Sequence, residues 1–169
     1  MTPQAANAVQ LPMLRRLRCG TCSPPLDMSY WSLSCAHLRE LYLNREWNKG
    51  VDSLHLPPQL ELLMFGDDFN QPLSLPFELP LSLITLHIGN TTDAQFNQPM
   101  QHTRLPPSLR KLHMPGEAFA PAAHELPLLP PLLNLLHVYK PKCMRTVWSF
   151  LLAAPCRSTR NMSHHPALN

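Results

Sequence analysis

The sequence predicts an α/β-type repeat solenoid, with short parallel β-strands stacked into one sheet and an irregular, helix-poor convex side. Two observations predict this fold. A Leu-Pro-x-x-Leu phrase recurs every 23 to 26 residues between residues 56 and 133, a period typical of one supersecondary unit per repeat. Twenty prolines against five glycines argue against long helices, because proline lacks the backbone donor that a helix interior needs.

Each Leu-Pro-x-x-Leu phrase leads into an expected strand. From its closing leucine the chain reads Leu-x-x-Leu-x-apolar, and alternate apolar residues are typical of a strand with one buried face. The proline fixes the start of the strand at a place where no ladder hydrogen bond is needed. The four clear copies span residues 60–65, 83–88, 109–114 and 133–138.

Two fainter copies of the strand pattern precede the clear ones, at residues 14–19 and 38–43. About six units are therefore expected. The Leu-x-x-Leu-x-apolar spacing is the strand signature of leucine-rich repeats, so the fold is expected to be leucine-rich-repeat-like.

A second phrase, an aromatic residue followed by asparagine, lies between the strands. It reads Phe-Asn-Gln-Pro at residues 69–72 and 96–99, is weaker at Trp47-Asn48, and has decayed at residues 119–121. We expect its phenylalanines to fill the far side of each coil. We expect its asparagines, Asn48, Asn70 and Asn97, to point inward as a stacked ladder that bonds the backbone of neighbouring turns.

The two Phe-Asn-Gln-Pro copies, in register with Leu-Pro-x-x-Leu, resemble the FNIP repeat proteins, a family related to leucine-rich repeats. The resemblance covers residues 56–141 well and 11–55 weakly. Repeats of this family can accompany an F-box or a kinase domain, which implies a substrate-recruiting arm in such proteins. Residues 1–55 show no recognisable F-box, so a role in ubiquitin ligation is an analogy with the family only.

The domain organisation expected from these patterns has three parts. Residues 1–10 form a flexible N-terminus, residues 11–141 form the solenoid, and residues 142–169 form either a cap or a disordered tail. The apolar run at 147–154 is too short to span a bilayer. We favour a short capping helix over an exposed anchor.

Composition and motifs exclude several function classes. The net charge is +3, a weak basic bias that does not imply nucleic acid. The chain has no Gly-rich phosphate loop, nucleophile elbow or metalloprotease histidine pair, so we expect no enzyme activity and no cofactor. An odd count of five cysteines and no signal peptide predict a cytoplasmic protein.

The N-terminal cysteines offer an alternative. Cys19, Cys22, Cys35 and His37 could complete a tetrahedral zinc site, or the first two could form a redox pair. Against this, Cys19 occupies the inward position of its expected strand, where cysteine behaves as a small apolar residue. We therefore expect no metal, and a zinc-binding or redox module is kept as the alternative function.

The expected binding surface is the concave face of the sheet. The residues that flank the second leucine of each unit should face outward there, beginning with Arg16 and Arg18. We predict a non-catalytic scaffold, monomeric and without nucleic-acid or membrane partners, that binds an unidentified protein here. A decayed or truncated repeat protein without separate activity is the remaining possibility. The predicted partner-binding residues are Glu40, Tyr42, Leu62, Met64, Thr85, His87, Lys111, His113, Leu135 and His137.

Three of these residues are histidines at one register, His87, His113 and His137. Neighbouring strands lie about 4.8 Å apart, so adjacent imidazoles should contact one another and share charge reluctantly. We expect solvent-facing histidines rather than a metal site, because a flat ladder lacks the convergent geometry that a metal needs.

Overall fold

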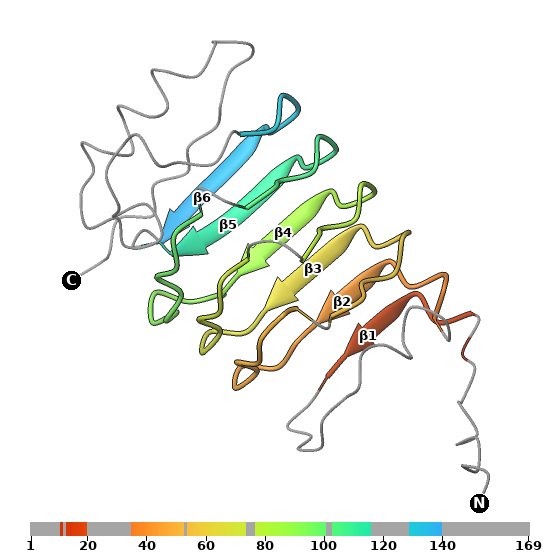
Figure 1. The fold of residues 1–169 in the computed structure, drawn as a ribbon, viewed down its shortest axis with the longest axis horizontal. Helices are drawn as coiled ribbons and strands as arrows, with labels where there is room; N and C mark the ends of the chain where they lie inside the picture. The colour runs from red at the N-terminus through yellow and green to blue at the C-terminus, as the bar shows by residue number, and fades with distance from the viewer. Residues whose placement is uncertain are drawn as a thin grey trace, which may run out of the picture.

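The protein is a parallel β-solenoid with one sheet (Figure 1). The structure is a computed structural model, and it describes residues 11, 13–19, 35–52, 54–73, 77–100, 103–115 and 129–139. Within these ranges the sheet has six strands, which lie side by side in chain order and pair in parallel. They are β1 (Arg16–Arg18), β2 (Glu40–Tyr42), β3 (Leu62–Phe65), β4 (Thr85–Ile88), β5 (Lys111–Pro115) and β6 (Leu135–Tyr139).

The connections between strands contain no helix within the described ranges. The parallel sheet is therefore confirmed, and the described parts of the connecting coils are helix-poor as predicted. The α/β label finds no support in these ranges, and the closer likeness to leucine-rich repeats stays a prediction. The predicted N-terminal segment 1–10 and the whole of the predicted cap or tail, 142–169, lie outside the described residues.

The register aligns the second leucine of every unit. Leu17, Leu41, Leu63, Leu86, Leu112 and Leu136 are paired across the sheet. The strands from the two faint repeats thus form at the predicted positions.

Each Leu-Pro-x-x-Leu phrase folds as a tight turn. The closing leucine donates its N–H to the carbonyl three residues before it, as in Leu60 to Pro57 and Leu83 to Pro80. The carbonyl just before a strand then accepts two N–H groups from the next coil: Arg39 O accepts from Glu61 and Leu62. This bend lets both leucines of Leu-x-x-Leu enter the core.

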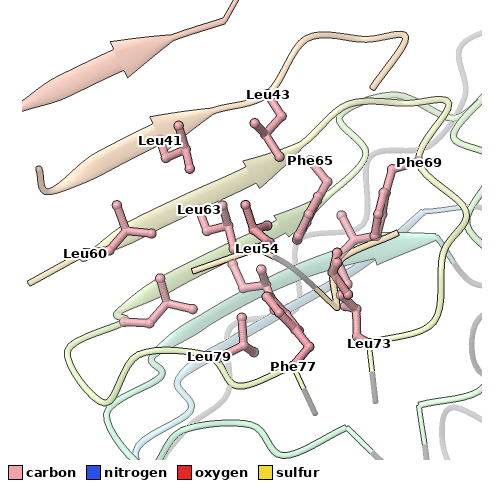
Figure 2. Packing of buried hydrophobic residues seen from close by; sticks show 14 of the residues in the cluster. Leu41, Leu43, Leu54, Leu60, Leu63, Phe65, Phe69, Leu73, Phe77 and Leu79 are labelled. Atoms are coloured by element: carbon pink, nitrogen blue, oxygen red, sulfur yellow. The ribbon is translucent and has the colours of Figure 1, made fainter. Parts of the chain in front are cut away.

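Buried hydrophobic side chains from successive units form one core cluster, part of which is seen in Figure 2. Its aromatic part is a row in which Phe65 and Phe69 stack with ring centroids 4.1 Å apart, and Phe96 follows at 5.8 Å from Phe69. Trp47 packs on the same row, 5.5 Å from Phe69. The predicted role of Phe69 and Phe96 is confirmed, because both are fully buried.

The predicted asparagine ladder is present, but its side chains do not point inward as predicted. Asn48 Oδ1 accepts from the backbone N of Asn70 at 2.9 Å and from Gln71 Nε2 at 3.0 Å. Asn70 Oδ1 accepts in the same way from Asn97 N and from Gln98 Nε2, each at 3.1 Å. The inward orientation predicted for Asn48 and Asn97 is wrong, because both are exposed. The preceding aromatic residue takes the inward position, which leaves the asparagine at the rim facing the next coil's backbone.

Candidate binding face

The outward side chains of the six strands form one continuous surface. We call it the outer sheet face, and it comprises residues 16, 18, 40, 42, 62, 64, 85, 87, 111, 113, 135 and 137. These side chains are half-buried or exposed, whereas the leucines between them on β2 to β5 are buried. Strand alternation therefore brings all ten predicted partner-binding residues together, while their binding of a partner stays a prediction, as does the concavity of the face.

The N-terminal end of the outer sheet face is a charged and aromatic network. Arg16 donates to Glu40 through Nε at 2.5 Å and Nη2 at 2.9 Å. Tyr42 OH donates to the same carboxylate at 2.9 Å, and the Arg18 guanidinium lies 4.6 Å from the Tyr42 ring centroid. A two-pronged arginine–carboxylate pair with a third donor fixes the positions of these side chains on the outer sheet face.

The Arg16 and Tyr42 contacts hold Glu40 in its ionised form. The hydrogen bond from Arg16 is the main influence that lowers the pKa of Glu40, and the bond from Tyr42 adds to it. Burial, followed by the bond to Glu40, raises the pKa of Tyr42. Tyr42 is thus a neutral phenol that donates to an ionised carboxylate.

A second ion pair, missed by the sequence reasoning, lies beside this network. Arg39 Nη1 contacts Glu61 Oε1 in the coil positions just before β2 and β3. Both residues directly follow the first leucine of the Leu-x-x-Leu-x-apolar pattern in their unit. Opposite charges at that position of successive units were a signal that could have identified the pair.

The middle of the outer sheet face is apolar. Leu62 and Met64 of β3 are half-buried, and they lie beside Glu40 and Tyr42 on one side and Thr85 and His87 on the other. An apolar centre next to a tyrosine and arginines is a composition typical of protein interfaces.

The three predicted histidines contact one another. His87 and His113 stack with ring centroids 4.0 Å apart and planes 6° apart, and His137 meets His113 edge-on at 5.3 Å. The Nδ1 atoms of His87 and His113 are buried and have no hydrogen-bond partner in the described part of the chain. Parallel pairing places the equivalent residues of successive units side by side on neighbouring strands, which is why the rings meet.

Burial is the main influence that lowers the pKa of His113, to about 4, with repulsion from His87, His137 and Lys111 adding to it. Burial also lowers the pKa of His87, helped by the charges of His137 and Lys111. Both rings are therefore neutral at physiological pH, which lets them stack without repulsion.

The alternative metal or redox site is only partly described. Cys19 is half-buried and Cys35 is buried, and burial raises the pKa of Cys35. Cys22 lies outside the described residues. Among the residues that the structure describes, no three His, Cys, Asp or Glu side chains are placed to hold a metal ion. No helix in the described part is both long enough and apolar enough to cross a membrane.

Comparison with known proteins gives one family. The model of the FNIP repeat matches residues 47–91, a segment that holds β3, β4 and the phrases around Asn48 and Asn70. No curated protein matches the chain.

Proposed function

We propose that this chain, an FNIP repeat-containing protein, is a non-catalytic scaffold that binds another protein through the outer sheet face. The observation that carries the proposal is the order of side chains along that face. A fixed Arg16–Glu40–Tyr42 network is followed by apolar Leu62 and Met64. Interfaces typically combine such aromatic, methionine and arginine residues with a polar rim.

The preorganisation of Tyr42 supports the same proposal. Its hydroxyl is bonded to Glu40, and Arg18 lies against its ring. A side chain that is already ordered before binding loses less conformational entropy when a partner packs on it. The repeat sheet gives this side chain a rigid support, because every strand is paired in register with its neighbours.

The proposal also covers the location of the protein, its oligomeric state and its class of partner. We propose that the protein acts as a cytoplasmic monomer with a protein partner and without nucleic-acid or membrane partners. The weak net charge of +3 and the odd count of five cysteines support this view.

The test is capture of a partner from a lysate of the protein's own source by the full chain. The variant Tyr42→Ala/Met64→Ala removes the aromatic ring of the N-terminal network and an apolar side chain beside it on the outer sheet face. We expect it to lose a protein that the wild type retains, because central apolar anchors carry most interface energy. The single variant Met64→Gln keeps the side-chain length but makes the side chain polar, and by itself it should weaken capture of the partner.

The control variant Glu46→Ala/Lys49→Ala changes two exposed residues outside the outer sheet face. It should capture the partner as the wild type does. Circular dichroism and thermal unfolding check that each variant is folded. The proposal fails if folded Tyr42→Ala/Met64→Ala captures the partner undiminished, or if the control loses it equally.

A further inference from the structure

The C-terminal half of the outer sheet face carries positive charge and lacks acids. Strands β4, β5 and β6 with the turns that lead into them span residues 79–88, 105–115 and 129–139, and these contain no Asp or Glu. They do contain Arg110 and Lys111, which are both exposed. Neither forms an ion pair with any residue that the structure describes.

In the N-terminal half of the molecule, by contrast, acids form ion pairs with arginines. Glu40 pairs with Arg16, and Glu61 pairs with Arg39. The acids of this surface are therefore already used within the protein. Unbalanced positive charge remains around β5, where a negatively charged partner gains most from electrostatic complementarity.

The positive charge of Lys111 disfavours protonation of the histidines beside it. Its charge contributes to the lowered pKa of both His87 and His113. The titratable group that faces His113 from β6 is His137, and the one from β4 is His87. Strand β3 presents Leu62 and Met64 toward β4 and brings no charge. All the named neighbours thus repel a proton from this cluster, and none attracts one.

The stacked histidines can act as hydrogen-bond donors. Their Nδ1 atoms are buried without a hydrogen-bond partner among the described residues, so a proton there would lack an acceptor. The tautomer with its proton on Nε2 leaves only a lone pair unsatisfied. Together with the Lys111 ammonium, which is donor-only, the cluster offers N–H groups and positive charge.

We infer that the bound partner presents an Asp or Glu side chain to the cluster of His87, Lys111 and His113. This inference rests on the proposed function of the outer sheet face. An ionised carboxylate is acceptor-only and accepts several hydrogen bonds, so it matches a group of donors that has no acid of its own. The partner is accordingly a protein with an acidic segment that lies across β4 and β5.

The test measures binding of a fluorescein-labelled oligoglutamate peptide to the full chain by fluorescence anisotropy at pH 7. Lys111→Gln should raise the Kd by about three- to tenfold, because it removes the one full charge of the cluster. Lys49→Gln is the matched control, since it removes the same charge from an exposed site outside the outer sheet face. It should change the Kd by less than about twofold, the range of a distant screened charge.

Other outcomes overturn the inference. Equal effects of the two lysine variants would mean that the peptide responds to net charge only. Absence of oligoglutamate binding, or equal binding of oligoglutamine, would remove the role of the carboxylate. A single-stranded oligonucleotide that binds more tightly than the peptide, and with the same Lys111 dependence, would assign the cluster to nucleic acid instead.

Failure of this inference is distinguishable from failure of the proposed function. Suppose that Lys111→Gln captures the lysate partner as the wild type does, while Tyr42→Ala/Met64→Ala loses it. The inference of an acidic segment on the partner is then wrong, and the proposal that the outer sheet face binds a protein is kept. If Tyr42→Ala/Met64→Ala still captures the partner, the binding face itself is wrong. Lys111 is exposed, so its substitution leaves the core intact.

Discussion

The imidazole rings of His87 and His113 stack at 4.0 Å on neighbouring strands while their Nδ1 atoms are buried without partners in the described part of the chain. Protonation of such a pair is unfavourable, because burial disfavours a charged ring and the neighbouring charges, including that of Lys111, repel the added proton. The free energy of unfolding should therefore be larger at neutral pH than in acid.

Stability should therefore fall in acid. The pKa of His113 drops from the ordinary 6.5 to about 4 in the folded state, and that of His87 is also lowered. Below pH 6.5 the unfolded chain takes up protons that the folded chain resists, so stability present above pH 6.5 is lost as pH falls toward 4. We expect a loss of about 1–2 kcal/mol, less than the full shift gives because the rings are half exposed.

Urea unfolding at pH 7.5 and pH 5 measures this dependence. The variant His87→Gln/His113→Gln should show a flatter pH profile between these values than the wild type. His37→Gln removes an exposed histidine elsewhere and should keep the wild-type slope. An unchanged slope in the double variant would show that other groups govern the acid sensitivity.

The asparagine ladder makes a prediction about neighbouring repeats. Asn70→Ala removes the oxygen that accepts from Asn97 N and Gln98 Nε2. We expect a loss of about 1–2 kcal/mol in the free energy of unfolding, because a backbone donor loses its partner. Asn70→Asp keeps an acceptor oxygen at the same place and should lose less.

Asn97→Ala is the matched control for Asn70→Ala. Among the described residues, Asn97 Oδ1 accepts only from Gln98 Nε2, at 3.3 Å and within the same phrase. Its loss should be about 0.5 kcal/mol or less, in the range of an ordinary surface substitution. Equal losses at the two positions would contradict a ladder that links one coil to the next.

Gly66 makes a close backbone approach that excludes a side chain. A Cβ at this position would lie 2.0 Å from Asn44 O and 2.6 Å from Arg45 Cα. Gly66→Ala must therefore push two coils apart, and we expect it to lose about 3 kcal/mol or more, as strained core substitutions do. Gly50→Ala places its Cβ in open space and should be neutral or slightly stabilising. Thermal unfolding of the two variants tests the contrast, and similar midpoints would contradict it.

The strands were predictable because their signal is a repeated spacing. Leu41 and Leu63 take the same position in their units, and parallel register brings such equivalent residues together. The same logic predicted that His87 and His113 would meet. The orientation of Asn70 and its relatives was not predictable, because Phe69 and Asn70 are consecutive residues at a bend, where no simple period says which one enters the core.

The Arg39–Glu61 pair escaped prediction for a related reason. Both residues lie just before a strand, where the bend breaks the alternation on which a sequence reading relies. The burial of the histidine Nδ1 atoms was also out of reach, since it depends on ring rotation rather than on strand register. The period thus predicts the positions within the strands, whereas at the bends only a comparison of charges between successive units would have indicated the Arg39–Glu61 pair.

Asp67 shows how a turn residue can hold two coils together. It is only 7% exposed, and its Oδ1 accepts from Asn90 N at 2.6 Å and from Thr91 N at 3.0 Å in the following coil. Asp67→Ala would leave both donors without a partner, so we expect a loss of about 2–3 kcal/mol, the range for hydrogen bonds to a charged group. Asp67→Asn keeps one acceptor oxygen and should lose about half as much. Chemical unfolding of both variants beside Asp68→Asn, a change at the less buried neighbour, measures the difference. A loss in Asp68→Asn as large as in Asp67→Ala would mean that turn charge, rather than the bonds of Asp67 to the next coil, stabilises this corner.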